Sequence, residues 1–320
     1  MYRVFVTRNI TQEAIALLST IAEVDVWQGD LPPSYDELLE HASQSNGLVC
    51  MLSDKVDKHL IQSSPNLKVI AQMAVGYDNI DLAAARKANI VVGHTPGVLT
   101  ETTADLAWAL LMAVARRVVE SDKEVREGIW RPWGPFVLCG QDIHHATIGI
   151  VGMGRIGQAV ARRAAGFDMK ILYSSLQPVE AVETQYDAKF VPLDYLLQNS
   201  DFVSLHTYLD DSSRRLIGRQ QFSLMKPSSY LINTARGAIV DSDALTLALQ
   251  TQQIAGAGLD VFDPEPIPPN HPILKLMNVV LTPHIASASN ATRSRMAMMC
   301  AENILAGLSE RPLPYAVPLE

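Results

Sequence analysis

The chain has 320 residues, of which 48% are hydrophobic and 19% are charged, and its formal net charge is -8. This length and composition predict a globular protein of about two domains and exclude an intrinsically disordered chain. The sequence contains no basic run that could neutralise phosphates, so we expect no nucleic-acid partner. The longest apolar stretch, residues 106–115, is well short of the roughly 20 residues that span a bilayer, and we expect no membrane association.

The cysteine content indicates a reducing environment. Cys50, Cys139 and Cys300 are odd in number and far apart. They form neither a zinc-binding CxxC pair nor an even disulfide framework. The first residues, MYRVFVTRN, lack the order of a secretory signal. We therefore expect a cytoplasmic location.

The first third of the chain alternates short apolar runs with amphipathic stretches. Such alternation predicts βαβ units and a parallel sheet. The expected strands are 3–7, 23–27, 47–52, 67–73 and 90–94, and the expected helices lie near 11–21, 35–43, 57–63 and 81–87. A long helix follows in TPGVLTETTADLAWALL (95–111), with its apolar face buried in the core.

A second series of the same kind begins at residue 147. Its expected strands are 147–151, 169–173, 202–206, 229–233, 255–260 and 278–282, and residues 289–308 predict one last helix ending near Gly307. The Pro-rich run 263–272 is interpreted as a rigid loop that leads directly into a strand. The fold class is therefore α/β, with two domains that each contain a parallel sheet flanked by helices, and the first domain ends near residue 98.

A glycine-rich turn follows the first strand of the second series. In IGIVGMGRIG (148–157), Gly152 permits a tight turn, Gly154 lets the backbone approach a pyrophosphate, and Gly157 lets the next helix pack closely. The start of that helix offers free N–H groups to phosphate. This pattern predicts a dinucleotide-binding site.

The end of the next strand bears on the choice of cofactor. Proteins that bind NAD place an acidic residue there for the ribose hydroxyls. This chain has Ser174 and Ser175 instead, which remove the charge that would repel a 2′-phosphate and offer hydroxyl groups. Arg155 could supply a cation. We expect NADPH to be preferred, with NADH possible.

Three side chains suited to hydride exchange with a 2-oxo acid follow predicted strands. Arg236 can bind a carboxylate through its guanidinium group. His284 can donate a proton to the carbonyl oxygen as a hydride reaches the carbon. Glu265 can bond the other imidazole nitrogen, orient the ring and favour its protonated form. All three would lie at the carboxyl edge of one sheet, where open α/β sheets bind ligands.

The motifs VGMGRIG, NTARG, LDVFDPEP and TPHIAS, in this order, resemble those of the D-isomer-specific 2-hydroxyacid dehydrogenases. The resemblance covers essentially the whole chain and implies that Arg236, Glu265 and His284 are the active-site residues. It implies two Rossmann-like domains, with a cofactor domain (100–286) inserted into a substrate domain (1–99 and 287–320). It also implies a homodimer built on the cofactor domains.

The resemblance assigns further site residues. Val75 and Gly76 would bind the substrate carboxylate through backbone N–H groups, Leu52 and Ser53 would line the pocket, and Ser287 would also contact the substrate. Trp133 would either reach the partner subunit's site or lie in the interface away from it. The cofactor would contact Thr103, Gly152, Gly154, Arg155, Ile156, Gly157, Ser174, Ser175, His206, Thr207, Thr234, Ala235, Asp260, His284 and Ala286.

Within this family the chain is most similar to the glyoxylate/hydroxypyruvate reductase branch. The expected reaction is reduction of glyoxylate and hydroxypyruvate to glycolate and D-glycerate. Two alternatives stay open: a reductase of larger 2-oxo acids such as 2-ketogluconate, and a cofactor-sensing partner protein without catalysis. Phosphite-oxidising relatives carry a lysine where this chain has Val75, which argues against that activity.

Two positions depart from the common family pattern: Tyr208 replaces a proline and Ala286 replaces a glycine, both near the expected nicotinamide side. We expect no metal site, because the adjacent residues His144 and His145 cannot face one metal ion from a regular element and no third ligand is near.

Overall fold

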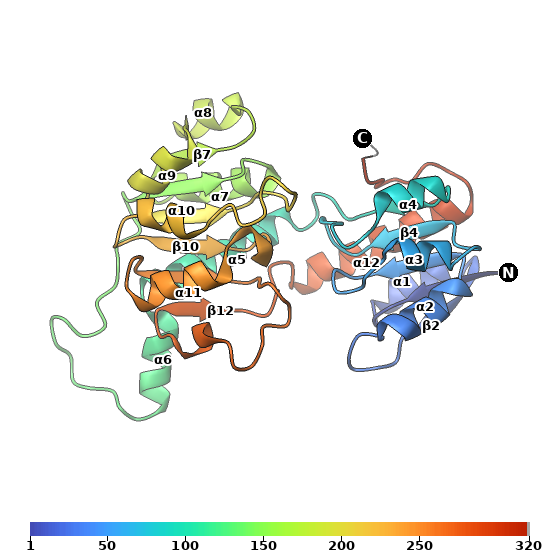
Figure 1. Ribbon diagram of the computed structural model, residues 1–320, viewed down its shortest axis with the longest axis horizontal. Coiled ribbons are helices and arrows are strands. Elements are labelled where there is room, and N and C mark those ends of the chain that lie inside the picture. The colour runs from blue at the N-terminus through green and yellow to red at the C-terminus, as the bar shows by residue number, and fades with distance from the viewer. Residues whose placement is uncertain (319–320) are drawn as a thin grey trace. The chain divides into compact units, whose positions relative to one another are not determined.

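The structure is a computed structural model that describes residues 1–318. The chain folds into two units: the first contains Met1–Leu99 and the chain from Ser287 onward, and the second is Thr100–Ala286 (Figure 1). Each unit contains one parallel sheet, as the alternation of apolar and amphipathic segments predicts. The prediction of an α/β fold with two flanked parallel sheets is confirmed.

The first unit contains a five-stranded sheet in the order β2-β1-β3-β4-β5. Because β1 pairs with both β2 and β3, the strand order reverses between β1 and β3. The elements are β1 (Tyr2–Val6), α1 (Gln12–Leu18), β2 (Ala22–Val26), α2 (Tyr35–Ser43), β3 (Gly47–Cys50), α3 (Lys58–Gln62), β4 (Val69–Gln72), α4 (Leu82–Lys87), β5 (Val91–Gly93) and α12 (Asn290–Leu308).

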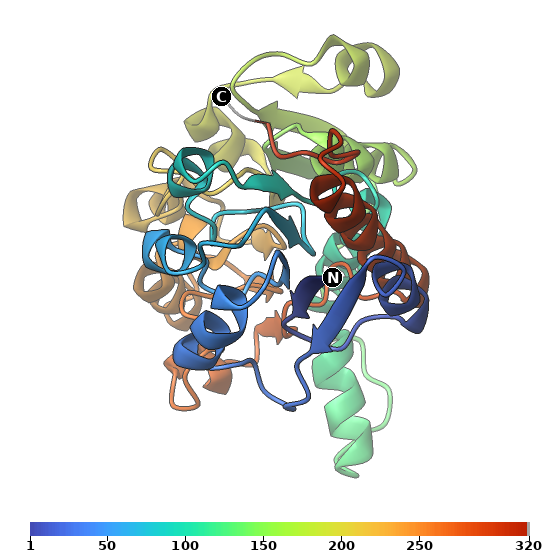
Figure 2. The same ribbon diagram turned by 90° about the vertical axis from the view of Figure 1, so that its right-hand side faces the viewer.

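Helices cover both faces of this sheet, so its strands are buried on both sides. Residues of α2, α3 and α4 form one apolar cluster with Phe5, Leu48 and Ile70. Residues of α1 and α12 form a second cluster with Val4 and Val49. Figure 2 shows the two sets of helices on opposite faces. The last helix therefore completes a sheet whose strands lie about 200 residues earlier in the chain.

The second unit contains a seven-stranded sheet in the order β12-β11-β10-β9-β6-β7-β8. The strand order reverses between β6 and β9, which is the doubly wound arrangement of dinucleotide-binding domains. The elements are α5 (Thr100–Ala115), α6 (Val118–Arg126), β6 (Thr147–Val151), α7 (Arg155–Ala165), β7 (Lys170–Ser174), α8 (Glu180–Tyr186), β8 (Lys189–Phe190), α9 (Leu193–Asn199), β9 (Phe202–Leu205), α10 (Arg219–Leu224), β10 (Tyr230–Asn233), the 3-10 turn η1 (Gly237–Ile239), α11 (Ser242–Gln250), β11 (Gly256–Leu259), the 3-10 turn η2 (Pro272–Lys275) and β12 (Val279–Leu281).

Two apolar clusters lie on the two faces of this sheet. One contains residues of α5 and α7, and the other contains residues of α9, α10 and α11. The apolar stretch 106–115 forms most of α5, in which Leu110, Leu111 and Val114 are buried, as predicted for a core helix. No helix among residues 1–318 combines the length and the apolar character that a membrane crossing requires.

The structure differs from the predicted elements at three places. Helix α6 and the short strand β8 were not predicted. The valines of α6 are exposed and both residues of β8 are exposed, so neither element has the continuous apolar run of a core element. The Pro-rich loop does not lead directly into a strand, since η2 (Pro272–Lys275) precedes β12. Pro272 at the first position of this turn suits a helical start.

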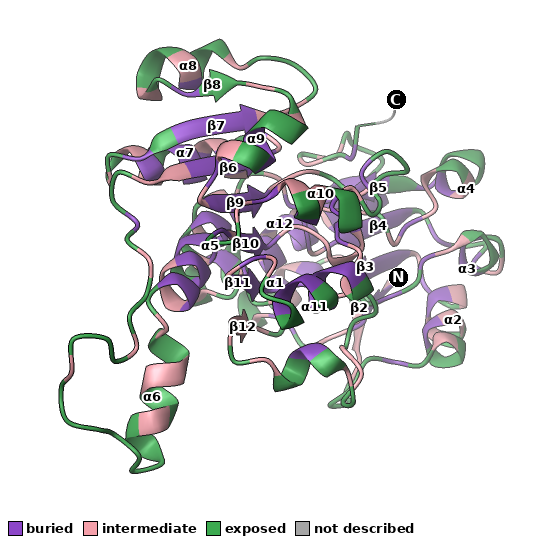
Figure 3. Cartoon of the chain, turned by 60° about the vertical axis from the view of Figure 1, so that its left-hand side comes forward, coloured by how far each residue is buried: buried purple, intermediate pink, exposed green. Residues whose placement is uncertain are grey.

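Helix α6 and the loop after it extend away from the rest of the second unit (Figure 3). Val118, Val119 and Val125 of the helix are exposed, and so are several apolar side chains of the loop. Trp133 and Phe136 are 88% and 89% exposed. We call residues 118–137 the apolar arm. Such an accumulation of exposed apolar side chains is unusual for a monomer.

Candidate active site

The carboxyl edge of the seven-stranded sheet brings together most of the predicted site residues. All its strands are parallel, so the residues that follow each strand lie at the same edge. Gly152 follows β6, His206 follows β9 and Thr234 follows β10. Asp260 follows β11 and the segment to His284 follows β12. The reversal of strand order between β6 and β9 makes this edge the expected ligand site.

The glycine turn after β6 has the geometry of a nucleotide-binding turn. Gly152 has φ +94°, and a Cβ atom there would lie 2.6 Å from the backbone carbonyl of His206. At Gly157 a Cβ atom would lie 2.2 Å from the carbonyl oxygen of Gly152. At Gly154 it would meet nothing within 4 Å, so that side of the turn is open. The turn is thus closed toward the protein and open where a phosphate would bind.

The N-terminus of α7 completes this turn. Gly154 is its N-cap residue and supplies no side-chain cap, so the first N–H groups of the helix point outward without an intrahelical acceptor. The buried hydroxyl of Thr234 has no hydrogen-bond partner among the described residues, and it follows β10 at the same edge. These features fit a dinucleotide: the residues would hold its pyrophosphate at the turn, as in other helix N-terminal phosphate sites.

The end of β7 lies beside this turn, because the Gly152 N–H donates to the carbonyl oxygen of Ser174 at 2.8 Å. The Ser175 hydroxyl donates to the Gln177 carbonyl at 2.5 Å and keeps only its acceptor capacity. The Tyr173 hydroxyl holds the following loop by donating to Glu183 and accepting from the Val179 N–H. Arg155, at the start of α7, is exposed. Ser174, which ends the strand, is half-buried.

His206 faces the opposite side of the glycine turn. Its Nε2 lies 2.8 Å from the Ser204 hydroxyl, and its N–H donates to the Val151 carbonyl at 2.7 Å. Burial lowers the pKa of His206 to about 4, so the ring is neutral at pH 7. It therefore cannot serve as the cation for a 2′-phosphate.

Two of the three predicted catalytic side chains are in direct contact. His284 Nδ1 lies 2.8 Å from Glu265 Oε2, and the other carboxylate oxygen of Glu265 accepts from the Phe262 N–H at 2.8 Å. The His284 side chain is 30% exposed and that of Glu265 is 35% exposed. Because Nδ1 is bound by Glu265, Nε2 is the nitrogen left to exchange a proton with a ligand.

Opposing effects act on Glu265. Burial raises the pKa of its carboxyl group, but the hydrogen bond and charge of His284, the Phe262 N–H and the charge of Arg236 outweigh it and lower the pKa below its ordinary value. Glu265 is thus a carboxylate at neutral pH. Arg236 acts on this carboxylate by its charge, and its own guanidinium donates to the Ala235 carbonyl at 2.8 Å. Both of the other predicted catalytic residues, His284 and Arg236, therefore interact with Glu265 at this edge of the sheet.

The backbone of His284 has φ +54°, in the left-handed region that few non-glycine residues adopt. Asp260, which is fully buried, holds this segment in place. Its carboxylate accepts from the Thr282 hydroxyl at 2.6 Å and from the Ile285 and Ala286 N–H groups at 2.8 Å each. Its carbonyl oxygen accepts from the His284 N–H at 2.9 Å. Asp260 therefore orients the segment that carries His284, a role the sequence did not indicate.

The predicted substrate residues of the first unit lie on two loops after neighbouring strands. Leu52 and Ser53 follow β3, and Val75 and Gly76 follow β4. Within residues 1–318, no hydrogen bond uses the backbone N–H of Val75 or Gly76. The Val75 carbonyl oxygen is bound by His94 Nδ1 at 2.9 Å. The N–H groups of Val75 and Gly76 therefore have no backbone acceptor among residues 1–318.

The remaining predicted residues have simple positions. Thr103 is buried in α5, Ile156 is the second residue of α7, and Thr207 follows His206. The Ala235 N–H donates to the Asn233 side chain at 3.0 Å. Ser287 begins the final segment of the first unit, and Trp133 is in the apolar arm of the second.

Sequence reasoning missed the polar side chains beneath the two loops of the first unit. They are Thr7, Arg8, Asp54, Gln72 and Asn79. Each lies within seven residues of the end of β1, β3 or β4. Their position after buried strands is the only signal in the sequence, and it does not distinguish them from other polar residues near strand ends. Among residues 1–318, no three His, Cys, Asp or Glu side chains come together to hold a metal ion.

Comparisons with known proteins agree with this architecture. The sequence profile of the family described as "D-isomer specific 2-hydroxyacid dehydrogenase, NAD binding domain" matches residues 108–286. A glyoxylate reductase of Korarchaeum cryptofilum (strain OPF8) is 52% identical over 305 residues, which cover 95% of this chain and 92% of that protein. The crystal structure of the TT0316 protein from Thermus thermophilus is 47% identical, with a TM-score of 0.93 over 99% of this chain and 100% of that one.

A third similar protein was solved with ligands. It is an NADPH-dependent glyoxylate/hydroxypyruvate reductase from Sinorhizobium meliloti in complex with NADP and malonate. It is 31% identical, with a TM-score of 0.86 over 99% of this chain and 96% of that one. These matches confirm the resemblance seen in the motifs. The chain belongs to the D-isomer-specific 2-hydroxyacid dehydrogenase family and is an NAD(P)-dependent oxidoreductase.

Proposed function

We propose that this enzyme reduces glyoxylate to glycolate and hydroxypyruvate to D-glycerate with NADPH. The main support for the proposal is the contact between His284 and Glu265, together with the positive charge of Arg236, which acts on the Glu265 carboxylate. Reduction of a 2-oxo acid requires a proton donor, which is His284 here, and a cation that binds the substrate carboxylate, which is Arg236. The glyoxylate reductase of Korarchaeum cryptofilum, about half identical to this chain, supports the choice of substrate.

When bound, the reduced cofactor supplies the hydride that reaches C2 of the oxo acid. Arg236 binds the substrate carboxylate through its guanidinium group. His284 Nε2 donates its proton to the carbonyl oxygen as the carbon is reduced, so the carbonyl becomes a hydroxyl. Glu265 keeps the ring oriented through Nδ1 and stabilises its positive charge before the transfer.

The loops of the first unit also take part in substrate binding in this proposal. Val75 and Gly76 offer backbone N–H groups to the carboxylate, and Leu52 and Ser53 line the pocket. Ser287 contacts the substrate as well. A site for a small oxo acid requires groups that bind its carboxylate, a proton donor and an apolar pocket wall close to the substrate.

The preference for NADPH rests on the end of β7. Ser174 carries no charge to repel a 2′-phosphate, and its strand end lies against the glycine turn. Arg155, exposed at the start of α7, is the proposed cation. The remaining proposed cofactor contacts are those assigned from the family motifs, with Asp260 and Ala286 on the nicotinamide side.

We also propose a homodimer that covers the apolar arm. The arm exposes three valines of α6 together with Trp130, Trp133 and Phe136. Burial of these side chains against a second copy would remove a large apolar area from water. Trp133 is the proposed contact with the partner's site. Equilibrium sedimentation should give a dimer, and Trp133→Asp should weaken it.

A cytoplasmic location is part of the same proposal. Cys50, Cys139 and Cys300 are all free thiols, as expected in a reducing compartment. Fractionation of cells that produce the protein tests this location directly.

The function is tested by steady-state oxidation of NADPH and NADH with glyoxylate, hydroxypyruvate and 2-ketogluconate. The proposal expects turnover of both small acids and a clear preference for NADPH. Faster turnover of 2-ketogluconate would assign a larger substrate. Cofactor binding without turnover of any oxo acid would instead favour a cofactor-sensing role.

A further inference from the structure

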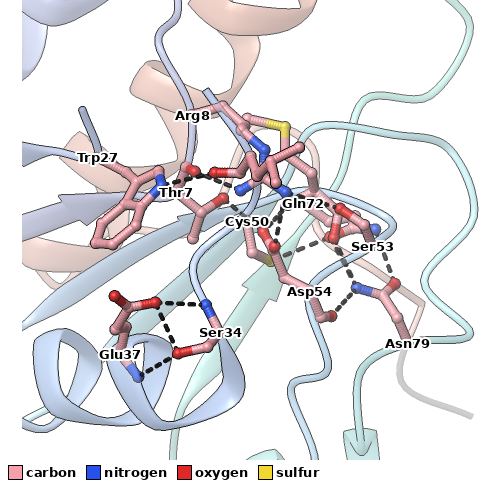
Figure 4. Close-up of polar contacts among 12 residues, drawn as sticks. Thr7, Arg8, Trp27, Ser34, Glu37, Cys50, Ser53, Asp54, Gln72 and Asn79 are labelled. Atoms are coloured by element: carbon pink, nitrogen blue, oxygen red, sulfur yellow. Dashed lines mark hydrogen bonds and ion pairs between the residues drawn. The ribbon is translucent and has the colours of Figure 1, made fainter. Parts of the chain in front are cut away.

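A network of polar side chains connects the two proposed substrate loops of the first unit. We call Thr7, Arg8, Asp54, Gln72 and Asn79 the loop network (Figure 4). Its members come from three places: the end of β1, the loop after β3, and β4 with the loop after it. The loop network therefore joins residues 51–54 to residues 73–76.

Asn79 makes the connection. Its Nδ2 donates to the Met51 carbonyl at 3.0 Å and to the Asp54 carbonyl at 2.8 Å. These two bonds hold both ends of the loop that contains Leu52 and Ser53. Its Oδ1 accepts from Gln72 Nε2 at 2.8 Å. The Asn79 carboxamide thus donates two hydrogen bonds to the main chain of the first loop and accepts one from the side chain of Gln72 in β4.

Gln72 extends the connection to the second loop. It is fully buried at the end of β4, and its Nε2 also approaches the Gly76 carbonyl at 3.3 Å. Its Oε1 accepts from the Cys50 thiol at 3.0 Å. Asn79 therefore contacts the first loop directly and the second loop through one buried amide.

Asp54 and Arg8 fix the first loop from its other side. The buried Asp54 carboxylate accepts from the Thr7 hydroxyl and from the Met51 N–H at 2.7 Å. Arg8 Nη2 lies 3.4 Å from Asp54 and donates to the Ser53 hydroxyl at 3.0 Å. Because Ser53 accepts this bond, its own hydrogen remains for a ligand oxygen.

We propose that Asn79 is a positioning residue for the 2-oxo acid: it holds the loop with Ser53 and the loop with Val75 and Gly76 at one fixed spacing. This inference rests on the proposed function of both loops. Nothing in the family motifs assigned a role to Asn79. Both N–H donors of its side chain are used on the first loop, and its oxygen accepts from Gln72, so it acts through the loops.

The expected signature follows from how the loops would bind substrate. Backbone N–H groups hold the carboxylate equally in the ground state and the transition state, because the carboxylate does not react. Loss of such uniform binding raises KM and leaves kcat nearly unchanged. A general loss of folded protein would instead lower the apparent kcat.

The test compares Asn79→Ala and Asn79→Asp with a matched control, Asn46→Ala. Asn46 also connects two segments of this unit, by accepting from the Arg3 N–H and donating to the Asn66 carbonyl, but it lies before β3 at the opposite edge of the sheet. Asn79→Asp keeps the side-chain size and removes both donated bonds. We expect a rise of about tenfold in KM for glyoxylate in both Asn79 variants, with kcat within about threefold. Asn46→Ala should keep the wild-type KM, and NADPH affinity should be unchanged in all three.

Hydrogen–deuterium exchange supplies a readout that does not depend on turnover. Asn79→Ala should speed exchange in peptides covering residues 51–56 and 73–78 together, whereas Asn46→Ala should affect neither. An unchanged rate in either peptide overturns the inference, and so does a wild-type KM in a folded variant of an active enzyme. If the wild-type protein does not reduce glyoxylate, the proposed substrate is wrong, and the exchange rates still decide whether Asn79 couples the loops.

Discussion

The two sheets of this protein have similar architecture but different carboxyl edges. At the edge of the second unit, His284 and Glu265 are about one-third exposed and charged groups face each other. At the edge of the first unit, the Asp54 side chain is 1% exposed and Gln72 is fully buried. The charged side chains at the edge of the second unit are thus partly exposed, whereas the polar side chains Asp54 and Gln72 at the edge of the first unit are buried.

This difference has a physical reason. A group that exchanges a proton with a substrate must be accessible and close to its ionisation range. A group that fixes loop shape works best when it is buried and fully hydrogen-bonded, because an unsatisfied buried partner is costly. The comparison teaches that changes in the second unit should alter kcat, whereas changes in the first should alter KM and stability.

The largest expected effect is on His284. His284→Gln removes the proton donor and should lower kcat with glyoxylate by about 100- to 10,000-fold, with NADPH binding retained. Steady-state kinetics and fluorescence titration of NADPH measure the two quantities. His271→Gln is the control, because His271 belongs to the same unit and bonds Ser242 away from this group. Equal losses in both variants would contradict the role of His284.

Glu265→Gln should have the next largest effect. It removes a charged hydrogen bond to His284 and should lower kcat by about 10- to 100-fold. A kcat equal to that of the wild type would show that Glu265 does not act through His284.

The same residue gives a stability prediction with a definite sign. The pKa of Glu265 is lower in the folded protein than its ordinary value of 4.5. Its ionised form therefore stabilises the fold above pH 4.5, and this contribution is lost as the pH falls through the lower folded pKa. Urea unfolding of wild type and Glu265→Gln should differ at pH 7 and converge below pH 4.5.

Ser174→Asp tests whether the side chain at the end of β7 selects the cofactor. A carboxylate at the end of β7 would repel a 2′-phosphate and accept bonds from ribose hydroxyls. We expect the ratio of kcat/KM for NADPH to that for NADH to fall by about tenfold. Ser223→Asp adds the same charge on exposed α10 and should leave the ratio unchanged. A ratio that does not move in Ser174→Asp would remove Ser174 from the cofactor site.

Asp54→Asn should show the smallest effect on activity and a clear effect on stability. It weakens the bonds from Thr7 and Met51 and leaves the Arg8 charge without its carboxylate. We expect a loss of about 2 kcal/mol in the free energy of unfolding and a rise of about threefold in KM. Asp243→Asn, on the exposed surface of α11, is the control. A fall in kcat as large as that of Glu265→Gln would remove the contrast between the two edges.

Much of this architecture was predictable from local patterns. The apolar runs located the strands of both sheets, because strands buried on both faces are continuously apolar. The terminal helix was predicted from its amphipathic pattern, and the core helix α5 was predicted from its apolar stretch. The short strand β8 and helix α6 were missed, because neither contains a buried residue and neither has the continuous apolar run of a core element.

The candidate site divides in the same way. Arg236, Glu265 and His284 could be found because each follows a strand and has a side chain with distinctive chemistry. Asn79 and Gln72 could not, since amides are common near strand ends and only contacts between β3 and β4 give them a role. Asp260 appeared as a cofactor residue in the motif, but its bonds to Thr282, Ile285 and Ala286 depend on the pairing of β11 with β12.

The sequence by itself determined the order of strands and helices, the glycine turn and the identities of the reactive groups, because these depend on short stretches of chain. Tertiary structure decided which groups touch: His284 meets Glu265 across 19 residues of sequence, and Asn79 meets Met51 across 28. The reason is that parallel strands bring their carboxyl ends to one edge, whatever length of chain separates them. Such contacts depend on which strands are neighbours in the sheet, and no short stretch of sequence specifies those neighbours.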